Sequence, residues 1–221
     1  MLNHTQCKFN EQEKVKHMSR LIIGLEGHDG TGKSATAKEV AKLLGGDVFF
    51  SDDETKKMRQ AVYKDKSLSV KQQMNAVEQI YRLESERFES ELGDKDIIIF
   101  DRTFVSHSVE ENVKDSLENN KPSYEAGYFP DGVVEPTIIF QVIIPEEERN
   151  RRVEDRGEEL SKRDEKLRDN HQYRQALELE RAKQGCVTLN LRLRDPETCA
   201  LRVLQSLLGS KLVEPLSINL K

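Results

Sequence analysis

Short apolar runs alternate along this chain with longer segments in which apolar residues recur every three or four positions. The short runs predict five strands, at Leu21–Leu25, Asp47–Phe50, Ile97–Phe100, Thr137–Ile144 and Cys186–Leu191. Strands of this kind that alternate with amphipathic helices are typical of an α/β protein. The pattern therefore predicts an open parallel sheet of about five strands with helices on both faces.

The segments between these strands have the apolar spacing of helices. We predict helices over Ser34–Leu44, Asp52–Val62, Ser69–Leu92, Thr103–Asn119, Glu146–Asp155, Glu165–Gln184 and Pro196–Leu208. The stretch Lys121–Glu135 holds two prolines and two glycines, which predicts a loop. Pro145 suits the first turn of the helix that follows it, because its missing N–H has no partner there anyway.

Length and composition limit the kinds of protein to consider. With 221 residues, one domain over residues 20–209 is expected, with a polar arm over 1–19 and a tail over 210–221. The apolar runs are far shorter than the ~20 residues of a membrane helix, and the polar start lacks the apolar core of a secretory signal. Three cysteines without a C-x-x-C pair fit a reducing compartment, so we expect a cytoplasmic protein without a membrane partner.

The charge balance bears on the partners. The net charge is -5, from 35 basic and 40 acidic residues. A protein that binds duplex nucleic acid usually carries a basic surplus, so a duplex partner is not expected.

One motif carries specific chemistry. The run Gly27-His28-Asp29-Gly30-Thr31-Gly32-Lys33-Ser34 fits G-x-x-x-x-G-K-[ST], follows a predicted strand and opens a predicted helix. Its glycines let backbone N–H groups approach phosphate oxygens, Lys33 can reach the β- and γ-phosphates, and Ser34 can ligate Mg²⁺. We expect ATP and Mg²⁺ as cofactors and an exposed Lys33 until nucleotide binds. The nucleotide-binding residues are predicted to be Gly27, Asp29, Gly30, Thr31, Gly32, Lys33, Ser34 and Ala35.

A second pair of residues ends the third predicted strand. Asp101 can hold Mg²⁺ there together with Ser34, directly or through water. Arg102 follows at the carboxyl edge of the sheet, where ligands bind in such folds, and its guanidinium can grip a phosphate.

These residues resemble those of a known family. The segments Leu25-Glu26-Gly27-His28-Asp29-Gly30-Thr31-Gly32-Lys33-Ser34, Phe100-Asp101-Arg102, Pro145-Glu146-Glu147 and Arg156-Gly157-Glu158 look like the thymidylate kinase family of P-loop nucleoside-monophosphate kinases. The resemblance covers about Leu21 to Leu208. It implies strand order 2-3-1-4-5, a helical lid at about residues 149–174 and phosphoryl transfer from ATP to a nucleoside monophosphate. It leaves a homodimer open.

The resemblance also implies residue roles. In the family the loop acid, here Asp29, lies near the sugar of the acceptor, and Arg102 and a helix arginine, best matched by Arg82, hold the acceptor phosphate. Ser106 keeps the serine that follows the Asp-Arg pair. Because this P-loop has no arginine, a lid arginine is expected to be catalytic, and the candidates are Arg156 and Arg163.

The base-recognising positions depart from the family pattern. Glu78 stands where the family has an aromatic that stacks on thymine, and Val109-Glu110-Glu111 replaces Ala-Tyr-Gln. Ser51-Asp52-Asp53-Glu54 replaces the usual Arg-Glu-Pro turn. An ionised carboxylate only accepts hydrogen bonds, so Glu78 and Glu110 favour an acceptor with an amino edge over thymidylate.

Two further functions stay open from the sequence. One is a kinase for a nucleoside or another small molecule with a hydroxyl acceptor, for which Asp101, Asp29 or Glu26 could supply the base. The other is a nucleotide-binding regulatory module that hydrolyses slowly or not at all.

Overall fold

The protein is a three-layer α/β structure, described here from a computed structural model over residues 20–119, 121–157, 162–191 and 195–210. Its strands are β1 (Leu21–Glu26), β2 (Asp47–Phe50), β3 (Ile97–Asp101), β4 (Ile138–Ile143) and β5 (Val187–Asn190). All neighbours are parallel, and the order β2-β3-β1-β4-β5 confirms the predicted sheet. The glycine-rich loop therefore leaves the central strand at the carboxyl edge.

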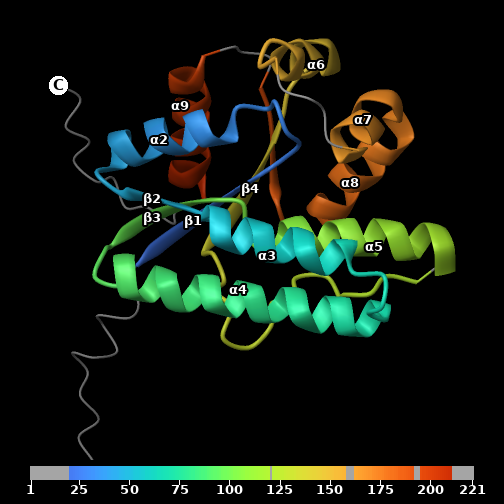
Figure 1. Ribbon diagram of the computed structural model, residues 1–221. Helices are drawn as coiled ribbons and strands as arrows, with labels where there is room; N and C mark the ends of the chain where they lie inside the picture. Colours follow the sequence, from blue (N-terminus) through green and yellow to red (C-terminus); the bar gives the residue numbers. More distant parts are fainter. Residues whose placement is uncertain (1–19, 120, 158–161, 192–194, 211–221) are drawn as a thin grey trace, which may run out of the picture.

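Helices cover both faces of this sheet (Figure 1). They are α2 (Lys33–Leu44), α3 (Asp53–Lys64), α4 (Val70–Leu92), α5 (Val105–Asn119), α6 (Glu146–Glu154), α7 (Lys162–Asp169), α8 (His171–Lys183) and α9 (Pro196–Gly209). On one face α2 and α9 pack together, and their apolar side chains form the largest core cluster with β1, β3, β4 and β5. The helices α4 and α5 lie on the opposite face, with α3 beside α4.

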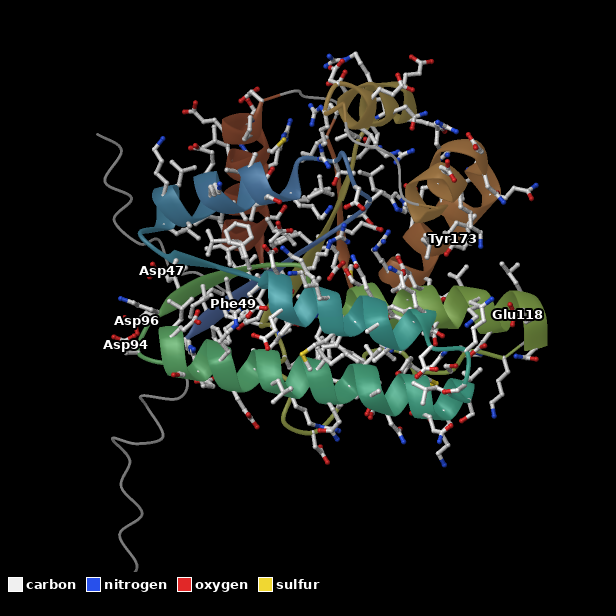
Figure 2. The ribbon with its side chains drawn as sticks, viewed as in Figure 1. Asp47, Phe49, Asp94, Asp96, Glu118 and Tyr173 are labelled. Carbon is white, nitrogen blue, oxygen red and sulfur yellow. The ribbon has the colours of Figure 1, made fainter. Side chains whose placement is uncertain are left out.

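The second face is built around aromatic side chains. Phe49 lies between the sheet and α4 (Figure 2), with its ring centroid 5.3 Å from that of Phe88 and 4.9 Å from that of Phe100. Edge-to-face and tilted pairs at such distances suit aromatic rings, so this cluster fixes α4 against β2 and β3.

The prediction of one continuous helix was wrong at one place. The segment Glu165–Gln184 is two helices, because Asn170 begins α8 by accepting a hydrogen bond from the N–H of Tyr173 at 2.9 Å. A side chain that caps a new helix competes with continuation of the old one. The predicted loop at Lys121–Glu135 is confirmed where it is described, since no helix or strand occurs there.

Two other expectations concern the edges of the chain and the membrane. The predicted arm at 1–19 and, beyond Ser210, the predicted tail lie outside the described residues. No helix in the described part combines the length and the apolar character that a bilayer crossing requires.

Candidate active site

The glycine-rich loop forms a cradle between β1 and α2. Gly27, Gly30 and Gly32 have φ values of 140°, 85° and 87°, in the region that favours glycine. A Cβ on Gly27 would lie 2.6 Å from the carbonyl oxygen of Val142, so no larger residue fits there. No side chain caps the first N–H groups of α2, and Ser34 and Ala35 are exposed at this end. The loop and helix thus offer backbone donors to an anion.

Lys33 does not lie where the sequence predicted it. Its side chain is buried, and Nζ donates to the carbonyl oxygen of His28 at 2.8 Å, with Asp29 Oδ1 at 3.9 Å. Because the carbonyl oxygen of His28 lies in the same loop and accepts this hydrogen bond, the Lys33 ammonium points into the protein. Burial first, and the charge of Arg102 second, lower the pKa of Lys33 to about 7. An anion that enters the loop would restore the charged form, which fits a polyphosphate.

This burial predicts how stability depends on pH. The folded pKa of Lys33 is about 7 and the usual value is 10.5, so between these values the unfolded chain binds more protons. Without nucleotide, the free energy of unfolding should therefore rise from pH 7 to 9.5. Urea unfolding of the wild type and of Lys33→Met at several pH values measures this. The wild type should have a lower free energy of unfolding than Lys33→Met, and this difference should shrink as pH rises. A difference that stays constant with pH would contradict the lowered pKa of Lys33.

Ser34 and Asp101 come together as a candidate cation site. The Ser34 hydroxyl donates to Asp101 Oδ2, and Asp101 Oδ1 is buried with no hydrogen-bond partner among the described residues. A buried carboxylate oxygen without a partner is costly, and a divalent cation would satisfy it. No three His, Cys, Asp or Glu side chains gather into a metal centre in the described ranges, so such an ion would need further ligands from a nucleotide or water. The residues present fit Mg²⁺.

Arg102 has an unusual backbone. Its φ is 77°, the single positive value among the described residues other than glycine, while its N–H donates to the carbonyl oxygen of Leu25 at 3.1 Å. This turn sends the guanidinium back to the loop, where it pairs with Asp29 and lies 3.4 Å from both the carbonyl oxygen of Gly27 and Ser106 Oγ. Strain of this kind is found where a side chain must point into a site.

A cavity of about 680 Å³ opens beside these residues. At one end lie Asp29, Ser34, Asp101 and Arg102, together with Ser106. The rest of its wall comes from β2, α3, α4 and α5, namely Phe50, Ser51, Lys56, Arg59, Gln60, Tyr63, Tyr81, His107 and Glu110. The cavity thus joins the predicted phosphate end to a wall that sequence reasoning mostly missed.

Helix α3 carries the most important of the missed residues. Arg59 pairs with Glu84 at 2.5 Å and lies 5.1 Å from the ring centroid of Tyr81, and Tyr63 hydrogen-bonds to His107 Nδ1 at 2.7 Å. Thr55 is the one buried residue of this helix. Polar contacts, not an apolar face, therefore hold α3 over the cavity, which is why its hydrophobic pattern gave no signal of these roles.

Two predicted acceptor residues lie elsewhere. Arg82 donates from Nε to the carbonyl oxygen of Asp131 at 2.8 Å and does not line the cavity. Glu78 does not line it either; it pairs with Arg82 at 3.5 Å and lies next to the Tyr124 hydroxyl. Arg59 occupies the cavity wall in place of Arg82. Of the two predicted base-recognising acids, only Glu110 lies on the wall.

Glu26 and Ser106 have mainly structural contacts. Glu26 is fully buried and accepts from the Thr103 N–H at 2.7 Å, the Thr103 hydroxyl at 2.9 Å and Ser106 Oγ at 2.6 Å. These bonds occupy both carboxylate oxygens and fix the start of α5. Glu26 is therefore poorly placed to act as a base, while Ser106 touches the cavity.

Two arginines of the predicted lid that were not among the candidates, Arg149 and Arg152, lie against the loop. Arg149 is buried with Nη1 3.5 Å from the carbonyl oxygen of Asp29, and a Cβ on Gly32 would lie 3.2 Å from Arg152 Nη1. Both project from α6, which starts at the same sheet edge as the loop. Because α6 directly follows a predicted strand, the sequence could have indicated that its arginines lie near the loop. Arg156 is exposed beyond α6 and does not line the cavity, and the side chain of Arg163 lies outside the described residues.

Comparisons with known proteins agree with this architecture. Residues 22–180 match the model of a family described as AAA domain. No curated protein matches the chain in sequence at a significant level.

Several solved structures that are similar to this one are kinases. Deoxyadenosine kinase from M. mycoides, with dCMP and dCDP bound, has a TM-score of 0.52 at 17% identity, over 86% of this chain and 100% of that one. Shikimate kinase from Acinetobacter baumannii, in complex with shikimate, has 0.52 at 18%, over 90% and 99%. Thymidylate kinase from Candida albicans has 0.57 at 14%, over 87% and 93%. At these identities the likeness shows the fold, which is that of P-loop kinases.

Proposed function

Because this chain belongs to the AAA domain family and has a P-loop kinase fold, we propose that it transfers the γ-phosphoryl group of ATP to a nucleoside monophosphate. The products are a nucleoside diphosphate and ADP. The proposal rests on the chemistry of the cavity wall.

The observation that carries the proposal is a pair of guanidinium groups in one cavity. Arg102 lies at the loop end and Arg59 on α3, and both line the same 680 Å³ space. Each already pairs with a carboxylate, Asp29 for Arg102 and Glu84 for Arg59, so both are oriented before any ligand binds. Two oriented guanidiniums suit the oxygens of a phosphate monoester.

The donor would occupy the loop. Its phosphates would lie against the backbone N–H groups of the loop and Lys33, and Mg²⁺ would be held by Ser34 and Asp101. When bound, this ion would neutralise charge on the phosphate oxygens. Arg149 and Arg152 of α6 already lie against the loop, so they, with Arg156 and Arg163, are the candidates to hold the transferring group.

The transfer needs little acid–base chemistry. A phosphate oxygen of the acceptor attacks the γ-phosphorus, the bond to the bridging oxygen breaks, and ADP leaves with that electron pair. A phosphate monoester is already an anion at neutral pH, so no residue has to remove a proton. The work of Arg59, Arg102 and Lys33 is to position the two nucleotides and stabilise charge.

A hydroxyl acceptor is the second candidate, because one carboxylate lies at the right place. Asp29 lines the cavity, and its Oδ1 lies 3.9 Å from Lys33 Nζ, on the acceptor side of the loop. A carboxylate there could take the proton of an attacking hydroxyl. Its Oδ1 is already engaged in the ion pair with Arg102, which favours the first candidate.

Removing the Arg59 guanidinium tests whether the acceptor is a nucleoside monophosphate or a hydroxyl compound. We expect Arg59→Gln to raise the KM for nucleoside monophosphates by ~10- to 100-fold and to change the KM for ATP by less than ~2-fold, because Arg59 lines the acceptor wall. The measurement is ADP formation over a panel of nucleoside monophosphates, nucleosides, shikimate and sugars.

Two matched variants control this experiment. Arg59→Gln/Glu84→Gln removes the ion pair without leaving Glu84 unpaired, and Arg202→Gln removes an exposed arginine on α9. Phosphorylation of nucleosides or sugars in place of monophosphates would establish the hydroxyl acceptor. No acceptor-dependent ADP from any member of the panel would favour a regulatory module.

A further inference from the structure

A chain of four polar side chains runs from the cavity wall into the protein. The Tyr63 hydroxyl hydrogen-bonds to His107 Nδ1 at 2.7 Å, and His107 Nε2 hydrogen-bonds to the Tyr124 hydroxyl at 3.1 Å. Tyr124 in turn lies next to the Glu78 carboxylate, which, after burial as the first cause, raises the pKa of the Tyr124 hydroxyl. Tyr63 and His107 line the cavity, whereas Glu78, at the other end of this chain of side chains, does not. The chain thus links α3, α5, the loop after α5, and α4.

His107 is neutral in this row of four side chains. Burial first, then the charges of Arg59 and Lys114, lower its pKa to about 4. A neutral imidazole has one N–H donor and one acceptor nitrogen, so its two neighbours must play opposite parts. The imidazole therefore transmits the direction of one hydrogen bond to the next.

Glu78 sets that direction. A carboxylate only accepts hydrogen bonds, and the Arg82 guanidinium pairs with it at 3.5 Å. The Tyr124 hydroxyl must then donate to Glu78 and accept from His107 Nε2–H. Nδ1 is left without a proton and accepts from the Tyr63 hydroxyl. The Tyr63 oxygen, with its proton spent on His107, has only lone pairs to offer the cavity.

We propose that Glu78, acting through Tyr124 and His107, makes the Tyr63 wall of the cavity a pure hydrogen-bond acceptor, so the site selects acceptor molecules whose far edge carries an amino or N–H donor. Glu110 lines the same cavity and adds a second acceptor-only group. A carbonyl edge would face two sets of lone pairs, and a buried polar edge without a partner is rejected strongly. Glu78, Tyr124 and His107 are positioning residues, and this inference rests on the proposed nucleotide kinase activity.

The first experiment reads the tautomer without any substrate. Long-range ¹H–¹⁵N NMR on imidazole-labelled protein distinguishes the Nε2–H from the Nδ1–H form of His107. We expect Nε2–H in the wild type. In Glu78→Gln, the new amide oxygen should still accept from Arg82, and the amide NH₂ should donate to Tyr124. Each hydrogen bond of the relay then changes direction, so the Nδ1–H form of His107 should appear. An Nδ1–H form in the wild type, or an unchanged tautomer in Glu78→Gln, would overturn the relay.

The second experiment reads specificity with acceptors that differ at one edge. CMP has an amino group where UMP has a carbonyl, and AMP has an amino group where IMP has a carbonyl. The wild type should favour the amino member of each pair by at least ~10-fold in kcat/KM. Glu78→Gln should lower that ratio to ~2-fold or below, because the Tyr63 hydroxyl can then donate. Preference for the carbonyl members by the wild type would overturn the specificity.

Two variants complete the design. Glu86→Gln makes the same change at an exposed position of α4 and should leave both the tautomer and the ratio unaltered. Tyr124→Phe keeps the edge-to-face packing with Phe104 but cuts the chain, so the ratio should fall there too. If no nucleotide is phosphorylated while the tautomer behaves as expected, the proposed activity fails and the relay stands.

Discussion

Replacing Lys33 with methionine is expected to lower kcat/KM for phosphoryl transfer by ~10³-fold or more and, at the same time, to raise the melting temperature of the nucleotide-free protein. The two effects have one cause. Lys33 is buried with its Nζ against a loop carbonyl, and burial lowers its pKa to about 7. The folded chain therefore bears the cost of a desolvated ammonium at neutral pH, and an apolar side chain of similar length does not.

Thermal unfolding and steady-state kinetics check both effects. A gain of ~1 kcal/mol would raise the melting temperature of a domain of this size by ~2–4 °C. Lys38→Met, at an exposed position one turn further along α2, is the matched control and should change neither quantity appreciably. A Lys33→Met protein that kept a tenth of the wild-type turnover would contradict the assignment of the loop as a donor site.

Removing the Arg102 guanidinium should reduce acceptor kcat/KM by ~10²- to 10³-fold and leave ATP affinity nearly unchanged. Arg102 lies on the side of the loop that we propose binds the acceptor, where it pairs with Asp29 and approaches Ser106. Because its φ is 77°, the replacement residue also matters for the backbone. Arg102→Gly relieves this strain and Arg102→Ala keeps it, so the glycine variant should be the more stable by ~1 kcal/mol and no more active.

The comparison of these two variants separates catalysis from folding. Isothermal titration with a non-hydrolysable ATP analogue measures the donor site, and kinetics with varied acceptor measure the other. An equal loss of ATP affinity would move Arg102 to the donor site and weaken the case for a monophosphate acceptor.

Local patterns in the sequence were enough to predict most of the fold. The strands β1, β3 and β4 are built mainly from apolar residues, and Gly45, with φ of 68°, ends α2 where the pattern predicted a helix end. The break at Asn170 was missed, because a single side-chain cap decided it against a helical pattern that continues on both sides. Periodicity reports which face is buried and carries little information on such a cap.

The candidate site was predictable only where its residues are neighbours in the chain. The loop and the Asp101-Arg102 pair are contiguous, and the structure brings them together at one sheet edge. The wall with Arg59 and His107 arises from the packing of α3 against α4 and α5, which no spacing in the sequence encodes. The burial of Lys33 was missed for a related reason, since its partner is a backbone carbonyl that any residue at position 28 would supply.

The polar attachment of α3 has a consequence for how the protein divides its stability. A helix with Thr55 as its one buried residue adds little to the apolar core. Its opening therefore exposes little apolar surface and costs less free energy than unfolding of the sheet and α4. Substitutions that loosen α3 can weaken acceptor binding while global thermal stability stays the same. The proposed capacity to bind an acceptor and the capacity to remain folded are thus largely separable traits, which can change independently during evolution.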